Sequence, residues 1–419
     1  MQYPTISEYV NARQDASDNL DMSTEATNAE LNEAITDAFG VKYSKDGRKL
    51  LKVPQKLDVT YPIKQGLYGT YSIKEGTKII CDMAFDSCRS LTDIVIPESV
   101  TSIGDCAFRG CRSLRSLVIP DGITCIGNEA FYDCCSLTDI AIPDSVTSIG
   151  DKAFYRCDSL TSFVIPNGVT SIGDSAFFFC SSLKSLVIPD SVTSIGNSAF
   201  GYCASLTILV IPEGVTSIGN HAFTVCESLR SIIIPDSVTS IGDGAFCRCK
   251  SLTNLVLPDG VTSIGDSAFS DCSSLTSLVI PEGVTSIGDY AFDGCCSLSS
   301  VDLPDSVTCI GDRAFRFCNS LSSLVIPDSV TSIGDWAFDG CSSLTSLVIP
   351  EGVTSIGDGA FRGCKSLTDI VIPDSVTSIG KDAFLWCSSL SEIVIPSSVT
   401  SIGKKAFGCC NIPTDLKQE

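Results

Sequence analysis

Cysteines are the residues of this chain that could do the most chemistry, and their spacing limits what that chemistry is. Of 23 cysteines, fifteen recur every 23 residues from Cys88 to Cys410. One cysteine per repeat leaves no paired Cys-x-x-Cys ligands for zinc. Neighbouring rungs of a parallel stack lie about 4.8 Å apart, whereas a disulfide needs Cβ atoms about 3.5–4.5 Å apart. The series therefore predicts reduced, buried thiols that fill a core position, with no disulfide and no metal.

Catalytic chemistry has little support in the sequence. His221 is the only histidine, and no serine or aspartate differs from its equivalents in the other repeats. The sequence contains no Gly-rich phosphate-binding loop and no isolated pair of carboxylates. Because a catalytic site needs several unlike groups that converge on one point, we expect no enzyme activity and no cofactor.

The acidic residues form regular series, and calcium is one use that could be made of them. Acids recur in one turn (Glu98 and its equivalents) and after a repeated glycine (Asp105 and its equivalents). Carboxylates stacked about 4.8 Å apart repel by about 1 kcal/mol in water, so Ca²⁺ could bridge them. Asn128, Asn167 and Ser397 interrupt the two series. Turn and capping roles tolerate such swaps and a cation ladder does not, so we expect no metal.

The net charge of −21 is unevenly spread along the chain. Residues 1–41 carry −7, residues 42–78 carry +6, and residues 79–419 carry −20. A field this negative argues against nucleic acid or anionic lipid as the main partner. The sequence contains no run of 18 apolar residues, so it predicts no membrane-spanning segment. Residues 1–10 lack the basic start and the apolar stretch of a secretory signal.

A 23-residue period decides the expected architecture. The Phe of a recurring Ala-Phe pair falls at fifteen positions, from Phe85 to Phe407, without insertion or deletion. A unit of this size cannot bury its apolar face alone, so consecutive units must stack into a solenoid. We expect a single curved parallel-β stack with one continuous strand layer.

The copy at residues 275–295 illustrates the local expectations. Its Leu-x-x-Leu-x-Ile segment alternates as a strand does, and Pro281 ends the pairing because it has no N–H to donate. The Val284-Thr-Ser-Ile stretch that follows reads as a second short extended segment. Gly288 recurs in fourteen of fifteen copies, which indicates positive φ or close backbone approach. The Asp or Asn that usually follows predicts an N-cap and a short helical or 3₁₀ turn over Asp-x-Ala-Phe-x-x-Cys.

Three segments are expected along the chain. Residues 1–70 form an N-terminal cap, residues 71–410 form fifteen repeats, and residues 411–419 form a polar tail. In the cap, a Thr27-x-x-Glu30 capping box opens an amphipathic helix that runs to Gly40. A hairpin follows, with strands at 41–44 and 49–53. Lysines near the C-terminal end of the array (Lys381, Lys404 and Lys405) are expected to blunt an open edge.

The repeat unit resembles a known family. Leucine-rich repeats run 20–29 residues and share the Leu-x-x-Leu-x-Ile spacing. With the proline after the strand, the Val-Thr-Ser-Ile-Gly-Asp stretch and the Ala-Phe-x-x-Cys turn, residues 71–410 resemble the BspA-like leucine-rich repeat family of bacterial and protozoan proteins. That resemblance implies a curved parallel-β solenoid used in adhesion and recognition, typically at the cell surface or secreted. The many free thiols and the missing signal favour the cytoplasm, and both locations stay open.

Variation among the copies concentrates in three positions, one before the Ala-Phe pair and two after it, which we call the variable slots. Every Tyr and Trp beyond residue 79 lies in these slots. Tyr, Trp and Arg dominate binding hot spots, whereas neutral drift, the alternative, should give mostly small polar residues. The candidate partner-binding residues are Tyr132, Tyr155, Phe178, Phe179, Tyr202, Tyr290, Phe317, Trp336, Trp386, Arg156, Arg248 and Arg316, and Arg109, Arg313 and Arg362 share the slots.

These patterns predict a non-catalytic protein-binding or adhesion scaffold that recognises a macromolecular partner, a protein or a glycoprotein. The alternative is an intracellular structural or regulatory protein–protein interaction module, which the free thiols favour. Regular rows of threonine also allow ice binding. The sequence does not name the partner.

Overall fold

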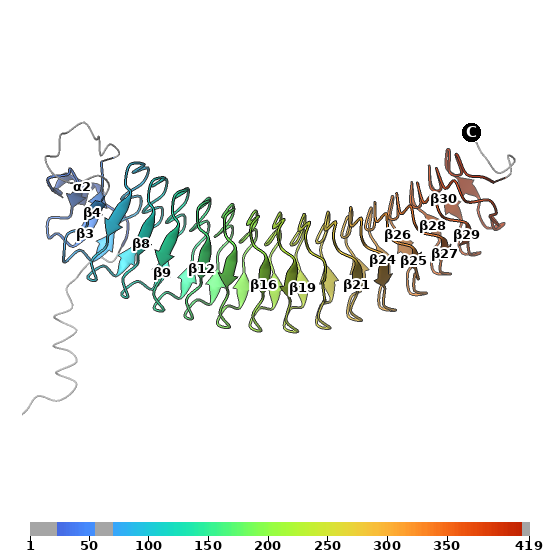
Figure 1. Cartoon of the computed structure of the whole chain (residues 1–419), viewed down its shortest axis with the longest axis horizontal. Coiled ribbons are helices and arrows are strands. Elements are labelled where there is room, and N and C mark those ends of the chain that lie inside the picture. Colours follow the sequence, from blue (N-terminus) through green and yellow to red (C-terminus); the bar gives the residue numbers. More distant parts are fainter. Residues whose placement is uncertain (1–22, 55–69, 413–419) are drawn as a thin grey trace, which may run out of the picture.

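The computed structural model describes residues 23–54 and 70–412, which form a gently curved rod of stacked turns (Figure 1). Each turn lies beside the turn 23 residues away, so equivalent residues are neighbours along the rod; Ile149, for example, pairs with Ile172. The parallel-β solenoid expected from the period is confirmed. Predictions for residues 1–22, 55–69 and 413–419 lie outside the described residues.

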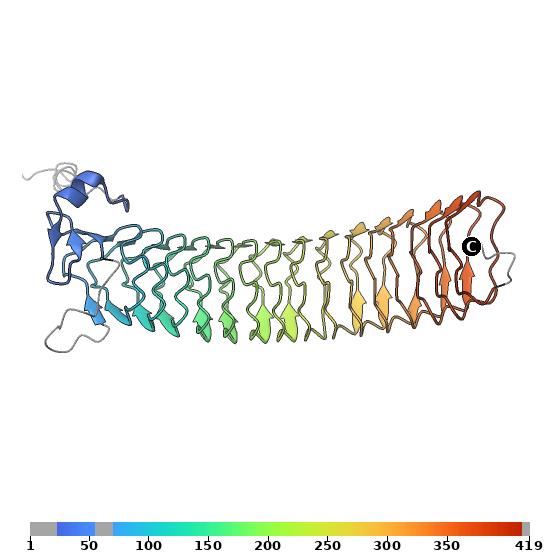
Figure 2. The same cartoon turned by 90° about the horizontal axis from the view of Figure 1, so that it is seen from above.

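Two rows of parallel strands, rather than the single layer expected from the sequence, run along the rod (Figure 2). The second row exists because the Thr-Ser-Ile stretch after each turn pairs with its own equivalents. The short-strand row contains β5 (Ile79–Ile80), β7 (Ser102–Ile103), β9 (Cys125–Ile126), β11 (Ser148–Ile149), β13 (Ser171–Ile172), β15 (Ser194–Ile195), β17 (Ser217–Ile218), β19 (Ser240–Ile241), β20 (Ser263–Ile264), β22 (Ser286–Ile287), β24 (Cys309–Ile310), β26 (Ser332–Ile333), β28 (Ser355–Ile356), β30 (Ser378–Ile379) and β31 (Ser401–Ile402).

The other row is formed by the segments that precede the proline. The long-strand row contains β4 (Thr70–Ser72), β6 (Asp93–Val95), β8 (Ser116–Val118), β10 (Asp139–Ala141), β12 (Ser162–Val164), β14 (Ser185–Val187), β16 (Ile208–Val210), β18 (Ser231–Ile233), β21 (Ser277–Val279), β23 (Ser300–Asp302), β25 (Ser323–Leu324), β27 (Ser346–Val348) and β29 (Asp369–Val371). A single bridge between Ser231 and Asn254 continues the row after β18.

The core is a set of side-chain columns, because the fixed period places the same residue type in every rung. The fifteen Phe rings from Phe85 to Phe407 stack with centroids 4.9–5.5 Å apart. Phe154, Phe177 and Phe200 are fully buried, as expected. Leu, Ile, Val, Ala and Cys columns surround the rings and form one continuous buried cluster. Stacked aromatic pairs each add about 0.5–1.5 kcal/mol beyond their burial.

The Asp-x-Ala-Phe-x-x-Cys segment is not the helical or 3₁₀ turn that the sequence suggested. The N–H groups of Tyr290, Phe292 and Gly294 donate along the rod to carbonyls of the next repeat, each at 2.8 Å. The N–H groups of Ala291 and Asp293 donate back three residues within the same turn. Backbone φ is positive at the first and third variable slots of all fifteen copies, between 53° and 76°. This alternation aims every second N–H along the axis, so the turn forms a third hydrogen-bonded ladder.

The Asp or Asn at the start of this turn bonds to the next repeat instead of capping a helix. Oδ1 of Asp266 accepts from the N–H of Asp289 at 2.8 Å, and the pattern runs from Asp82 to Lys381. Both Asp and Asn carry the accepting oxygen, which explains why they interchange. A Cβ on Gly288 would lie 2.8 Å from Oδ1 of Asp266, so the repeated glycine reflects close backbone approach.

The N-terminal cap continues the short-strand row. Thr27 and Glu30 make the expected capping box, but helix α2 (Asn28–Asn32) is only five residues long and ends before β1 (Ile35–Thr36). Strands β2 (Lys42–Tyr43) and β3 (Lys49–Lys52) form the expected hairpin, and β3 pairs parallel with β5. The cap thereby covers the first rung of the array.

Candidate partner-binding surface

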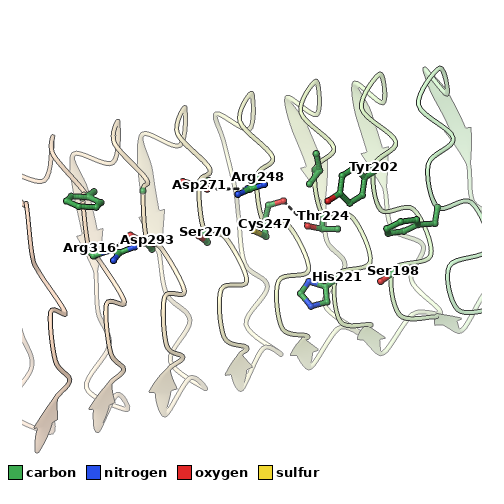
Figure 3. A pocket seen from close by; sticks show the side chains of 14 residues that line it. Ser198, Tyr202, His221, Thr224, Cys247, Arg248, Ser270, Asp271, Asp293 and Arg316 are labelled. Carbon is green, nitrogen blue, oxygen red and sulfur yellow. Dashed lines mark hydrogen bonds and ion pairs between the residues drawn. The ribbon is translucent and has the colours of Figure 1, made fainter. Parts of the chain in front are cut away.

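The variable slots lie on the turn that connects each short strand to the next long strand, and Figure 3 shows side chains of these slots in successive turns of the rod. Tyr290 and Trp336 hold the first slot and Phe317 the third, all with φ of 57–59°. Left-handed backbone costs a residue with a Cβ about 1–2 kcal/mol. Backbone stability therefore does not explain the large side chains found there.

Five of the candidate aromatic residues form one cluster. The rings of Tyr132 and Tyr155 stack with centroids 4.7 Å apart, and Phe178 continues the stack at 5.4 Å from Tyr155. Phe179 and Tyr202 close the cluster, 4.5 Å from each other. All five are half-buried against one another and none belongs to the buried core. These five residues therefore lie outside the core, and each is partly covered by its neighbours.

Several slot side chains lie over a glycine one repeat later. A Cβ on Gly201 would lie 2.6 Å from the Phe178 ring, and a Cβ on Gly340 would lie 2.5 Å from the Phe317 ring. The same relation joins Trp336 to Gly359. Three further pairs follow it: His221 with Gly244, Asp271 with Gly294, and Leu385 with Gly408. Consecutive slots are therefore packed to fit each other.

The candidate arginines are paired with acids of adjacent repeats: Arg316 and Arg156 with the preceding repeat, and Arg248 with the following one. Arg316 makes two bonds to the buried Asp293 carboxylate, at 2.7 and 2.9 Å. Arg248 lies 3.5 Å from Asp271 in a looser ion pair in which both side chains are about half exposed. Arg156 lies 3.7 Å from Asp133. Of these three, Arg248 keeps the most guanidinium surface open to a partner, with 56% of its side chain exposed against 47% for Arg156 and 28% for Arg316.

A second group of rings gathers toward the C-terminal end. The guanidinium carbon of Arg362 lies 5.3 Å from the Trp336 ring centroid and 4.4 Å from that of Trp386. Arg362 also lies 3.6 Å from Asp339, whose pKa is raised by burial despite the opposing effect of the guanidinium. Phe317 and Trp386 are 45% and 47% exposed, so this group offers the most open aromatic surface of the slots.

Between the two aromatic groups the surface is hollowed. Small residues hold the slots here, including Thr224, Cys247 and Ser270, and they leave a trough of about 750 Å³ (Figure 3). Tyr202 and Phe317 line it toward its two ends. The sequence reading did not identify this trough, although aligning the copies shows the small residues between two groups of large ones.

The variable slots are nearly neutral in a strongly acidic chain. They contain eight basic and seven acidic residues, a net charge of +1, whereas the whole chain carries −21. The excess acid lies instead in rows beside the short strands. A nearly neutral face rich in aromatic residues and arginine suits a macromolecular interface better than the acidic faces do.

The long-strand row presents an apolar stripe. In each Leu-Val-Ile segment the Leu and Ile point inward, so the Val points out. Thirteen aliphatic side chains on this face are 50–80% exposed. They are Val95, Val118, Val164, Val187, Ile208, Val210, Ile233, Val256, Val279, Val325, Val348, Val371 and Val394.

The threonine row has a structural use. The Thr147 hydroxyl donates to the Thr124 carbonyl at 3.1 Å, and the Thr308 hydroxyl donates to the Thr285 carbonyl at 3.1 Å. These bonds hold neighbouring rungs together. They give the regular threonine row a structural role.

The cysteine column is buried, as expected. All 23 cysteines lie in the described residues and none is in a disulfide. Each column thiol from Cys111 to Cys410 donates to the carbonyl of the Phe 26 residues earlier, as Cys134 does to Phe108 at 3.2 Å. Burial raises the pKa of Cys226 to about 12, so these thiols stay protonated and unreactive.

Within residues 23–54 and 70–412, no group of three or more His, Cys, Asp or Glu is arranged to hold a metal ion. The same part of the chain contains no helix long and apolar enough to cross a bilayer.

Comparison with known proteins supports the geometry. A family described as the BspA type leucine rich repeat region (6 copies) matches residues 78–207, 193–322 and 308–415. A leucine-rich repeat protein from Bacteroides ovatus is 27% identical, with a TM-score of 0.58, over 90% of this chain and 91% of that one. A leucine-rich cell surface protein from Faecalibacterium prausnitzii is 31% identical, with a TM-score of 0.50, over 80% of this chain and 92% of that one. A comparison with curated proteins finds no match. The chain belongs to the BspA-type leucine-rich repeat family.

Proposed function

We propose that this protein is a non-catalytic recognition scaffold that binds a macromolecular partner, a protein or a glycoprotein, through its variable slots. The observation that carries the proposal is the packing of the slots. Large side chains such as Phe178 and Phe317 occupy positions that lie over a glycine one repeat later. Neutral drift does not predict that a large side chain and a glycine occupy the same slot in consecutive repeats.

Energetics support the same reading. Trp336 and Phe317 take left-handed backbone, which costs about 1–2 kcal/mol for each. Exposed Trp, Tyr and Arg side chains are typical of binding hot spots. The aromatic groups also lie outside the buried columns, so they can contact a partner without disturbing the core.

The family supports a scaffold and favours a partner outside the cell. Leucine-rich repeat folds generally serve as non-catalytic scaffolds with extended binding surfaces. The Faecalibacterium prausnitzii relative is a cell surface protein, which favours adhesion for this chain as well. The 23 free thiols favour the second candidate, an interaction module in a reducing compartment. Fractionation of the native host separates the two.

Site-specific photo-cross-linking tests the binding face. A photoreactive residue is placed at Tyr155 in the slots and, as a matched control, at Thr147 on the short-strand face. Both positions are in the same rung of the rod, so only the face differs. Incubation with host extract and with intact host cells should give a discrete cross-linked species from position 155 alone. Cross-linking from Thr147 alone, or from neither position, would overturn the proposal.

A further inference from the structure

The trough between Tyr202 and Phe317 has its own chemistry, distinct from that of the aromatic groups beside it. Its lining combines apolar ends with polar side chains in the middle, among them His221 and Arg248 (Figure 3). The slot residues between its two ends are small, so the trough is open along the rod and does not close into a small-molecule pocket.

Hydrogen-bond donors predominate among the groups that the trough leaves available. The Tyr202 hydroxyl and the His221 ring make no hydrogen bond to other described residues, and the Arg248 guanidinium has only its loose contact with Asp271 at 3.5 Å. Of the two carboxylates that line the trough, Asp293 takes both bonds from Arg316, and Asp271 has only its loose contact with Arg248. A ligand group that only accepts hydrogen bonds and carries negative charge fits this set.

The local charge also differs from that of neighbouring repeats. The ladder position beside the first slot holds Asn197 and Asn220 at this end of the trough, where most repeats hold Asp. Neutral amides keep the hydrogen-bonded ladder intact, since Asn220 donates its N–H to Oδ1 of Asn197 at 2.9 Å. The substitution removes two negative charges, one beside Ser198 and one beside His221.

The dimensions fit an extended chain. Tyr202 and Phe317 are five repeats apart, which corresponds to about 24 Å at about 4.8 Å per rung. A polypeptide in extended conformation covers that distance with about seven residues at about 3.3 Å each.

We propose, on the basis of the function proposed above, that the trough binds an extended acidic segment of a protein partner. A central Asp or Glu carboxylate meets Arg248, displacing its loose contact with Asp271, and apolar side chains at the two ends contact Tyr202 and Phe317. Charge-assisted pairing of a carboxylate with a guanidinium supplies the specificity.

A glycan fits the same surface less well. Sugars pack against ring faces, and within the aromatic cluster those faces are used by Tyr132, Tyr155 and Phe178 to stack on each other. The −21 charge of the chain disfavours nucleic acid, whose phosphates need basic patches. The experiment below includes an acidic oligosaccharide to separate these cases.

Fluorescence polarisation with synthetic probes tests the proposal. The probe is a labelled seven-residue peptide with Phe at both ends, Glu in the centre and Ser elsewhere. The matched peptide carries Gln in the centre, and a labelled oligogalacturonate serves as the acidic sugar. The proteins are the unchanged chain, Arg248→Ala, and Arg230→Ala. Arg230→Ala removes the same charge from the exposed side of the long-strand row, and both variants are checked by melting curve.

The proposal predicts that the Glu peptide binds at least about tenfold more tightly than the Gln peptide, the ratio expected for one charge-assisted pair. Arg248→Ala should remove that difference and Arg230→Ala should retain it. Equal binding of the two peptides, preferential binding of the oligogalacturonate, or equal loss in both variants would overturn the acidic-segment proposal. If cross-linking from Tyr155 persists in any of those cases, the proposed function stands and only the acidic-segment proposal is rejected. If cross-linking from Tyr155 is also absent, both proposals are rejected.

Discussion

The ring of Phe178 lies over Gly201, the residue that holds the same slot one repeat later. A Cβ atom at Gly201 would approach two ring carbons to 2.6 and 2.7 Å, distances that packed side chains do not tolerate. The two residues are 23 positions apart in sequence and are matched in size. This relation shows that the surface of the rod is organised between repeats as well as within them.

Gly201→Ala should therefore lower the free energy of unfolding by about 1–3 kcal/mol, the usual cost of overpacking. Urea denaturation measures the change. In a Phe178→Ala background the ring is gone, and the same Gly201→Ala change should be neutral or stabilising, since it reduces the conformational freedom of the unfolded chain. An equal cost in both backgrounds would show that the ring does not require the glycine.

The Asp/Asn ladder predicts a graded response at one position. Asp266→Asn keeps the oxygen that accepts from the N–H of Asp289 and should change stability by less than about 0.5 kcal/mol. Asp266→Ala removes the acceptor and should cost about 0.5–1.5 kcal/mol. Thermal unfolding of the two variants compares them directly. A helix N-cap would also tolerate Asn, so the distinguishing readout is amide hydrogen exchange. Faster exchange at Asp289, in the next repeat, is expected only for the ladder.

The cysteine column should make the protein sensitive to alkali. Burial raises the pKa of Cys88 and Cys226 to about 12, whereas an unfolded thiol titrates near about 8.5. Between those values the unfolded chain loses protons that the folded chain keeps. Stability is therefore fully present below about pH 8.5 and falls as pH rises, by about 1.4 kcal/mol per pH unit for each buried thiol.

Melting curves between pH 7 and about pH 10 test this slope. Replacing three column cysteines, Cys203, Cys226 and Cys249, by Ala should flatten it in proportion. Maleimide labelling of the native protein gives a second check, because only accessible thiols such as Cys125, Cys296 and Cys409 should react. A slope that is unchanged in the triple variant would contradict the assignment of the effect to these thiols.

Tryptophan fluorescence reports on the C-terminal aromatic group, since Trp336 and Trp386 are the only two tryptophans. Arg362 lies against both rings, so Arg362→Ala should uncover ring surface, shift emission to the red and increase quenching by iodide. The cost in stability should be about 0.5–2 kcal/mol for the lost cation–π contacts. Arg115→Ala, on the other side of the rod, is the control and should leave the emission unchanged.

The sequence predicted the solenoid because its period is exact in length and repeats every core residue type. Gly288 and its equivalents were correctly linked to close backbone approach. The helical turn was wrong because an Asp before Ala-Phe looks like an N-cap, and a local pattern does not show that the carboxylate bonds to Asp289 in the next repeat. The sequence also predicted only one strand layer, because a local pattern does not show that the Thr-Ser-Ile stretches of neighbouring repeats pair with each other.

The sequence indicated which positions form the candidate surface, but it did not predict the contacts between their side chains. Variation among the copies marked the slots, and Tyr132, Tyr155 and Phe178 do lie together. The pairing of Arg316 with Asp293 depends on how side chains lean along the rod, which spacing alone does not fix. An alignment of the fifteen copies would have shown that a glycine follows several of the large slot residues in the next repeat, as Gly201 follows Phe178.

The binding of two surface variants to the cross-linked partner tests the central claim most directly. One variant replaces aromatic slot residues by Ser, and the other replaces aliphatic residues of the long-strand row in neighbouring rungs by Ser. The first changes Tyr132, Tyr155, Phe178, Phe179 and Tyr202, and the second changes Val164, Val187, Val210 and Ile233.

Both variants should remain folded, because these side chains lie outside the buried columns; a core change such as Phe177→Ala should instead cost about 3–5 kcal/mol. The account predicts that the slot variant loses binding and the row variant retains it, with melting curves confirming the folded state of each. Undiminished binding by the folded slot variant, or loss of binding in the row variant alone, would contradict it.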